Sequence, residues 1–486
     1  MKRVKYSIYI LAAIVLAGTA CKKSFLEIDP QQNTDVAQTV TDVPSTRAAV
    51  NGIYALLQSA NSYGRTASLI PDLMSDNLQI SVINANRYQP QDQYAMAAND
   101  GMATNLWNNL YQVVANANLV IEKGEPLEVP VADTAEKRKL VGQAYALRAF
   151  GYFSLVRFFA QPYNFSAGAT HLGVPITLKT ATDKSGVVAL GRNSVKENYD
   201  QIIKDLDSAV SKLNTDTAAT STSSKTRFNY FGGLALLSRV YLYKEDYAKA
   251  IDAANKVIDR KKYTLLPGAT LVADFRKQSN AETIFEVAFT ATDNNSTDAL
   301  GYFYAQGGYG DAIATDTMYK IYTAADARRG FITRSRRTGT GGENPANIVN
   351  KYNNITTYEE NLKVLRLAEV YLNRAEAYAY SNQDNLARAD LNVITTRGDA
   401  AATVPGTLAG DDLKAAILVE RRKEFAFEGH RLFDLTRRKQ TFTKTRRGTI
   451  TFIVNAPENK TILPIPQREM DANPAIKGQQ NPGYGN

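Results

Sequence analysis

Residues 418–438 read LVERRKEFAFEGHRLFDLTRR, and this stretch decides how the C-terminal part of the chain folds. Glu420, Glu424 and Glu428 recur at every fourth position, so a helix would carry three carboxylates on one stripe. Residues at heptad spacing give the same helix an apolar side: Leu418, Phe425 and Leu432. Matching cations come from five arginines: Arg421, Arg422, Arg431, Arg437 and Arg438. The pattern predicts a helix held in place by ion pairs.

Glu428, His430 and Asp434 lie close together in this stretch and allow two interpretations. One is a catalytic or metal-binding group, and the other is an ion-paired structural segment that turns at Gly429. A zinc site needs more than one nitrogen or sulfur ligand, and the chain contains only two histidines and one cysteine. Arginines beside carboxylates usually neutralise them in fork-shaped pairs. We therefore expect a structural segment that fastens the last helix pair to the C-terminal tail, without catalytic residues, metal or cofactor.

The first twenty residues have the features of a lipoprotein signal peptide. A basic start, MKRVK, is followed by an apolar run, Ile8 to Leu16, that is too short to span a bilayer. Small residues then precede Cys21, the only cysteine, although Gly18 departs from the usual lipobox. We predict a signal peptide at 1–20, lipidation of Cys21 and a lipid-anchored tether at 21–35. The mature protein would be exported and free of disulfides.

The mildly basic charge selects no class of partner, and the distribution of the basic residues does not indicate nucleic-acid binding. The formal net charge is +9, and removal of the signal peptide would lower it to +6, because the basic start carries three positive charges. A nucleic-acid-binding protein is expected to gather its basic residues in a stripe or patch. The densest basic cluster borders a glycine-rich loop and is interpreted as a solvated or ion-paired rim: Arg328, Arg329, Arg334, Arg336 and Arg337.

Helical periodicity dominates the rest of the chain. Helices are predicted over 42–60 and 105–123, and the only tryptophan, Trp107, is expected in the core on the apolar face of the second. Three later stretches each contain two helices rich in Ala, Gly, Tyr and Leu, near 144–213, 234–258 and 365–394. Small residues let paired helices approach closely, as in tetratricopeptide units. We predict a mainly α fold in which antiparallel helix pairs form a scaffold within one domain, residues 36–486.

Two loop-rich insertions interrupt the scaffold, near 61–103 and 263–358, with a short strand predicted at 282–288. A proline-rich tail, 462–486, is expected to cover the domain. Aromatic side chains among Gly, Asn and Asp have no helical face to pack into, so they are candidates for a ligand platform. The alternative is a loop folded on its own rings. The predicted ligand-binding residues are Tyr63, Asn77, Arg87, Tyr88, Tyr94, Tyr302, Tyr304 and Tyr309.

Several short motifs, in their order along the chain, resemble the SusD/RagB family of outer-membrane nutrient-uptake lipoproteins. They are Cys21 with FLE at 25–27, WNNLYQVVANAN at 107–118, ALRAFGYF at 146–153, GVP at 173–175, DL at 205–206, LRLAEVYL at 365–372, ERRKE at 420–424, EGHRLFDL at 428–435, LPIP at 463–466 and QNPGY at 480–484. The resemblance covers nearly the whole mature chain.

This resemblance implies a surface-exposed lipoprotein of the outer membrane with a helical, tetratricopeptide-like domain and no enzymatic activity. It also implies a partner, a TonB-dependent transporter of the SusC type, which receives the ligand. Family members bind oligosaccharides or, in some cases, peptides. Their ligand loops vary between members, so the family motifs assign no ligand residue in this chain.

Several functions remain open from the sequence. The favoured one is oligosaccharide capture, because tyrosine rings suit the apolar faces of sugars and polar side chains suit their hydroxyls. Peptide capture and a transporter lid with little ligand affinity of its own are the alternatives within the family. A glycoside hydrolase would need two carboxylates, and Glu428 and Asp434 are the nearest candidates.

Overall fold

The computed structural model describes residues 39–180, 188–214 and 224–485. The predicted signal peptide, Cys21 and the predicted tether lie outside these residues. Within the described part of the chain, none of the helices combines the length and apolar character that a membrane crossing requires.

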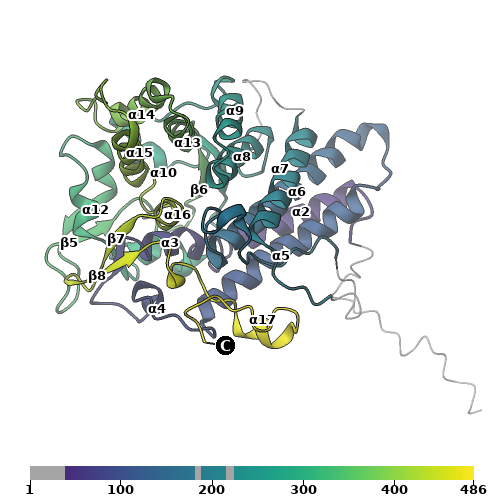
Figure 1. The fold of residues 1–486 in the computed structure, drawn as a ribbon, viewed down its shortest axis with the longest axis horizontal. Coiled ribbons are helices and arrows are strands. Elements are labelled where there is room, and N and C mark those ends of the chain that lie inside the picture. Colours follow the sequence, from purple (N-terminus) through teal and green to yellow (C-terminus); the bar gives the residue numbers. More distant parts are fainter. Residues whose placement is uncertain (1–38, 181–187, 215–223, 486) are drawn as a thin grey trace, which may run out of the picture.

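The longer helices pack against one another in the order in which they occur along the chain (Figure 1). Their bounds are α2 (Val43–Gln58), α5 (Gly101–Gly124), α6 (Thr134–Phe159), α7 (Val195–Leu213), α8 (Tyr230–Lys244), α9 (Tyr247–Ile258), α13 (Leu367–Tyr380), α14 (Asp384–Gly398) and α15 (Gly410–Glu424). The helices α6 and α7, α8 and α9, and α13 and α14 pack as pairs, and α13 also contacts α9 and α15. The predicted mainly α fold built from helix pairs is confirmed.

Local sequence explains where these helices start and which of them is central. Asp42 caps α2 by accepting a hydrogen bond from the backbone N–H of Ser45, and Ser194 and Glu197 form a capping box at the start of α7.

Helix α6 has no polar side over its second half, because it packs against α2, α5, α7 and α8. Its buried Arg148 is neutralised by Asp205 of α7, with 2.6 Å between the nitrogen and oxygen atoms.

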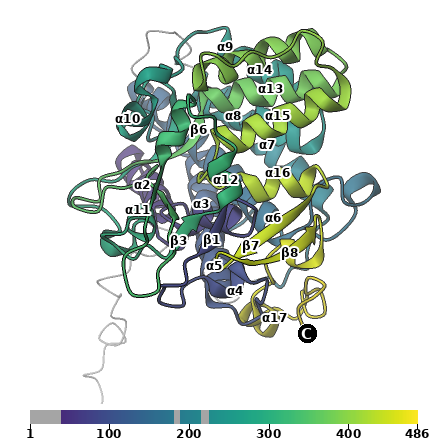
Figure 2. The ribbon, with the colours of Figure 1, turned by 90° about the vertical axis from the view of Figure 1, so that its left-hand side faces the viewer.

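Short helices and strands lie beside the long helices and are visible at the front of Figure 2. The short helices are α3 (Thr66–Leu73), α4 (Gln89–Asp92), α10 (Leu271–Arg276), α11 (Leu300–Tyr304), α12 (Asp316–Lys320), α16 (Arg431–Arg437) and α17 (Gln467–Ala472). The strands are β1 (Leu78–Ile80), β2 (Thr283–Val287), β3 (Ala312–Ala314), β4 (Ile332–Ser335), β5 (Ala346–Val349), β6 (Leu362–Arg366), β7 (Thr441–Arg446) and β8 (Ile450–Asn455).

The strands form three small antiparallel sheets that join the insertions to the scaffold. One sheet has the order β1–β3–β5–β4, and β2–β6 and β7–β8 form two-stranded sheets. Strand β2 is the strand predicted at 282–288. The sheet β1–β3–β5–β4 combines a strand from the first insertion with three from the second, so the two predicted loop regions fold together.

The segment 61–103 is more ordered and more buried than its sequence suggested. It contains α3, β1 and α4, and all eight residues of α3 are buried. Its sequence, TASLIPDL, shows no helical periodicity because the helix is surrounded on every side, and eight residues are too few to reveal a pattern.

Two details of the C-terminal region also differ from the prediction. Helix α15 ends at Glu424, so Glu428 lies in the following turn, where Phe427 and Gly429 have φ values of 68° and 79°. The proline-rich tail is not wholly extended, because α17 begins directly after Pro466. The tail does cover the scaffold, and the N–H of Leu463 donates to the carbonyl of Phe158 at 2.7 Å.

Candidate functional site

The charged residues of 418–438 form buried ion pairs, as the structural interpretation predicted. Glu428 contacts Arg366 of β6 at 2.7 Å and Lys351 at 2.5 Å. Asp434 contacts Arg421 at 3.0 Å. These pairs join α16 to α15, and they join the turn between the two helices to β6 and to the segment before it, whereas the sequence had suggested the proline-rich tail as the partner.

His430 is also buried, and its surroundings keep it uncharged. Its ring lies 4.7 Å from that of Phe425, centroid to centroid. Burial, followed by the nearby charges of Arg239 and Arg421, holds the pKa of His430 well below its usual range. Among residues 39–180, 188–214 and 224–485, no group of three or more His, Cys, Asp and Glu side chains could hold a metal ion.

Four of the predicted ligand residues lie in the interior and make structural contacts. The Tyr63 hydroxyl shares a 2.8 Å hydrogen bond with that of Ser154, and Tyr94 donates to the carbonyl of Met74. Asn77 donates to Asp72 at 2.6 Å. Tyr304 is fully buried. Because Tyr63, Asn77, Tyr94 and Tyr304 offer no free surface, they support the loops instead of forming an open binding surface.

The other predicted residues gather around Tyr309. The Arg87 guanidinium carbon lies 3.6 Å from the centroid of the Tyr309 ring, and the Tyr302 ring meets Tyr309 edge-on at 4.8 Å and 89°. Tyr358 adds a third ring, 6.0 Å from Tyr302. We call Arg87, Tyr302, Tyr309 and Tyr358 the tyrosine platform; all four side chains are half-buried.

Tyr88 lies at the edge of this platform. Its ring meets that of Phe303 edge-on at 5.3 Å, and its hydroxyl accepts a 3.0 Å hydrogen bond from Arg65. It is half-buried and holds the segment of Arg87 against the second insertion.

The platform forms because the second insertion folds back on itself. Helix α11 directs Phe303 and Tyr304 into the core and leaves Tyr302 half-buried. The chain then turns, and the N–H of Tyr309 donates to the carbonyl of Tyr302 at 2.8 Å. A side chain at Gly308 would place its Cβ 2.3 Å from that carbonyl oxygen, so glycine is required at this close approach.

Charged groups hold the platform in position. Arg87 donates to Asp311 at 2.9 Å, and Asp311 is almost fully buried. Arg337 donates to the carbonyl of Tyr309 at 2.8 Å. The Arg87 side chain remains 35% exposed, so its guanidinium can donate further hydrogen bonds beside an aromatic surface. Stacking surfaces with polar donors at their edge suit the apolar face and the hydroxyls of a sugar ring.

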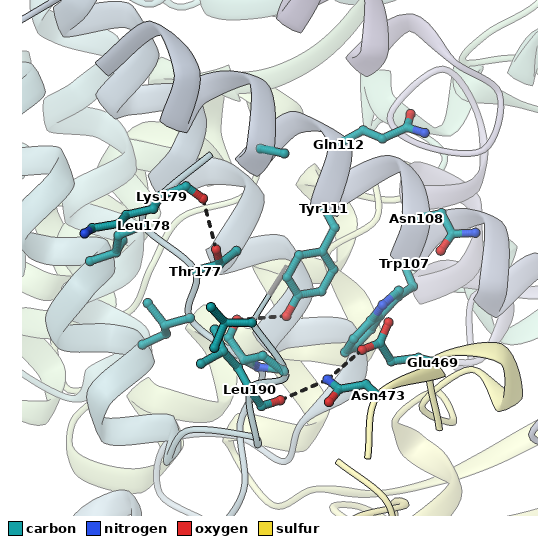
Figure 3. A pocket seen from close by; sticks show the side chains of 14 residues that line it. Trp107, Asn108, Tyr111, Gln112, Thr177, Leu178, Lys179, Leu190, Glu469 and Asn473 are labelled. Carbon is teal, nitrogen blue, oxygen red and sulfur yellow. Dashed lines mark hydrogen bonds between the residues drawn. The ribbon is translucent and has the colours of Figure 1, made fainter. Parts of the chain in front are cut away.

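A second feature is an open cavity on the helical side of the molecule (Figure 3). Its volume is about 640 Å³, and it lies between α5, the segments 175–179 and 188–190, and α17. Trp107 and Tyr111 of α5 line it together with Glu469 and Asn473 of the tail. Trp107 is 2% exposed and belongs to the core, as predicted, but it also forms part of this wall.

Sequence reasoning missed Tyr358 and the cavity. Tyr358 sits in a loop rich in Asn and Thr, and the rule that selected the other tyrosines would have found it. The cavity depends on contacts between segments far apart in the sequence, which no local pattern shows.

Two family models match the chain. One, described as the SusD family, matches residues 340–484, and the other, described as "Starch-binding associating with outer membrane", matches residues 24–242. The chain belongs to the SusD/RagB family. Among related SusD-family sequences, SusD-like protein P2 of Formosa agariphila is 25% identical over 98% of this chain and 99% of its own length. SusD-like protein P38 of the same organism is 24% identical over the full length of both chains.

Solved structures agree with this assignment. A putative sugar binding protein from Bacteroides vulgatus superimposes with a TM-score of 0.83 at 28% identity, covering 92% of this chain and 100% of the other. A SusD superfamily protein from Bacteroides thetaiotaomicron superimposes with a TM-score of 0.81 at 27% identity, covering 91% of this chain and 100% of the other. A laminarin-binding SusD-like protein superimposes with a TM-score of 0.73 at 22% identity, covering 92% of this chain and 100% of the other, and shares the fold.

SusD-like proteins are binding proteins of a carbohydrate-binding family and not enzymes, and the chain is one of them. The glycoside hydrolase alternative is therefore excluded. Its candidate carboxylates, Glu428 and Asp434, form salt bridges with Arg366 and Arg421.

Proposed function

We propose that the protein captures an oligosaccharide at the cell surface on the tyrosine platform and passes it to a TonB-dependent transporter of the SusC type. The observation that carries this proposal is the stacking of the half-exposed Arg87 on Tyr309, with Tyr302 and Tyr358 beside them. The rings form an apolar surface, and the guanidinium provides donors at its edge.

The descriptions of related proteins support the choice of ligand, and the predicted lipid anchor and the family resemblance support the location and the partner. The family description names starch, and one structural relative is described as binding laminarin, so neutral glucans are the first ligands to test. Lipidation of Cys21 would anchor the protein in the outer membrane and keep the folded domain near a transporter. The surface location and the transporter partner are expectations that the family resemblance implies.

The purified protein without its signal peptide should be applied to an oligosaccharide array and to a peptide array. We expect binding to one class of oligosaccharide, and markedly weaker binding in Tyr309→Ala. Binding to peptides alone would favour the peptide-capture alternative, and binding to neither array would favour a lid that acts only together with the transporter.

A further inference from the structure

The cavity of Figure 3 has an aromatic wall that also carries a hydrogen-bond donor. Trp107 is only 2% exposed, and the centroid of its ring lies 4.7 Å from that of Tyr111 and 4.9 Å from that of Phe159. Its indole nitrogen is not among the fully buried side-chain atoms without a partner, so the N–H can donate to solvent or to a bound molecule. An oxygen atom from a molecule in the cavity would complete this site.

The cavity is held open by hydrogen bonds on two sides. On one side, Tyr111 donates to the carbonyl of Pro175 at 2.9 Å and Asn118 donates to that of Thr177 at 2.9 Å. On the other side, Asn473 donates to the carbonyl of Leu190 at 3.0 Å. Figure 3 shows the bonds of Tyr111 and Asn473 across the walls of the cavity. The walls are therefore fixed before a ligand arrives, and the volume lies in the range of ordinary ligand pockets.

Unused hydrogen-bonding groups line its rim. Asn108 and Gln112 lie one turn apart on α5, are exposed, and make no side-chain hydrogen bond to a described residue. Glu469 accepts a bond from Asn473 and has further acceptor capacity. A ligand that carries several hydroxyls could satisfy these amides, the carboxylate and the indole N–H together.

The charges and the apolar wall narrow the class of ligand. Lys179 and Glu469 carry opposite charges, so the lining has no net charge and favours a neutral ligand. Leu178 and Val188, which line the cavity, are 42% and 68% exposed, so the wall also offers an apolar surface. Neutral molecules with an apolar face and many hydroxyls are saccharides.

From these observations we infer that the cavity between α5, segments 175–179 and 188–190, and α17 is a second binding site, for a short neutral saccharide. In Figure 2, α17 lies below the centre and α11, which carries Tyr302, lies at the left edge, so the two sites are separate. The choice of saccharide rests on the proposed function, but the site does not depend on the tyrosine platform.

The sole tryptophan gives a direct test, because Trp107 lies in the cavity and the platform contains only tyrosines and an arginine. Trp fluorescence of the full folded domain should be titrated with maltoheptaose and with laminarihexaose. We expect a saturable change in emission and protection from acrylamide quenching with at least one of them. The change should persist in Tyr309→Ala, which weakens platform binding.

The double variant Asn108→Ala/Gln112→Ala should weaken this response about tenfold, because two hydrogen bonds from exposed amides are lost. Asn105→Ala, an exposed asparagine of the same helix that does not line the cavity, is the matched control and should respond like the unaltered protein. A fluorescence response that is absent for both saccharides, or that survives in the double variant, would overturn the second site. Calorimetry with the same saccharides on Asn108→Ala/Gln112→Ala, which keeps the tyrosine platform intact, shows whether the proposed function fails as well.

Discussion

Arg366 of β6 is buried and contacts the carboxylates of Glu282, Glu424 and Glu428. Burying a charge costs several kcal/mol unless each member of the cluster finds partners, so these side chains depend on one another. The spacing of Glu424 and Glu428 among arginines predicted ion pairs, but it did not predict Arg366 or Lys351. Those partners come from distant segments, and their contacts follow from tertiary packing.

The substitution Glu428→Gln should lower the free energy of unfolding by about 3 kcal/mol, because the buried Lys351 would lose its carboxylate partner and Arg366 would lose one of its three. Urea unfolding followed by circular dichroism measures this change. Glu136→Gln is the matched control, because its pair with Arg47 is exposed and should contribute within about 0.5 kcal/mol. Equal stability of the two variants would contradict a structural role for Glu428.

At the scale of elements, the second insertion shows what a sequence can predict about a site. The run of tyrosines and glycines indicated a ligand loop, and Tyr302 and Tyr309 do meet there. The sequence could not distinguish Tyr302 from Tyr304, since the short helix α11 has only five residues and no visible period. Tertiary packing determines which side of α11 faces the core, and it buries Tyr304.

Replacement of Gly308 by alanine should disturb the platform without unfolding the protein. The new Cβ would lie 2.3 Å from the Tyr302 carbonyl, so the turn must shift and move Tyr302 away from Tyr309. We expect about a tenfold loss of oligosaccharide affinity by calorimetry, with little change in melting temperature. Gly406→Ala, where no atom lies within 4 Å of the new Cβ, is the control. Unchanged affinity in Gly308→Ala would show that the turn does not position the rings.

The contact between α13 and α16 predicts sensitivity to acid. Burial acts to raise the pKa of Glu376 and of Asp434, but nearby arginines, with Arg437 common to both, lower each to about 2. These carboxyl groups normally titrate near 4.5 and 3.8, so the folded state keeps them ionised at a pH where the unfolded chain is protonated. Their stabilisation is complete above about pH 5 and is lost as the pH falls toward 2.

Urea unfolding between pH 6 and pH 2.5 tests this expectation. The unaltered protein should lose roughly 2 kcal/mol per carboxyl group over this window, as an order of magnitude. Glu376→Gln should be less stable at pH 6 but should lose less on acidification. The same slope in both proteins would contradict the role of Glu376.

At the scale of the whole molecule, periodicity predicted the helix pairs and therefore the fold class. It failed over 61–103, because α3 is buried on all sides and its residues show no polar face. The platform could be predicted only in part, since it brings together residues 87, 302, 309 and 358 through the sheet of β1, β3, β5 and β4. The extent of the domain and the lipid anchor stay predictions.

The lipid anchor can be tested in a bacterium that makes the protein. Cys21→Ser should abolish incorporation of labelled palmitate and move the protein from the outer-membrane fraction to the soluble fraction, because no thiol would remain for lipidation. The folded domain of this variant should bind oligosaccharide as before. Continued labelling and membrane retention of Cys21→Ser would contradict lipidation at this position.

The central claim is that the tyrosine platform binds oligosaccharide, and isothermal titration calorimetry with the oligosaccharide selected on the array tests it most directly. The double variant Tyr302→Ala/Tyr309→Ala should bind about 30-fold more weakly than the unaltered protein, because two stacking rings are removed from the centre of the site. Tyr319→Ala, which removes a half-buried tyrosine flanked by Arg329 and Arg334 outside the platform, should bind normally. Unchanged affinity in the double variant, with its fold intact by circular dichroism, would contradict the claim.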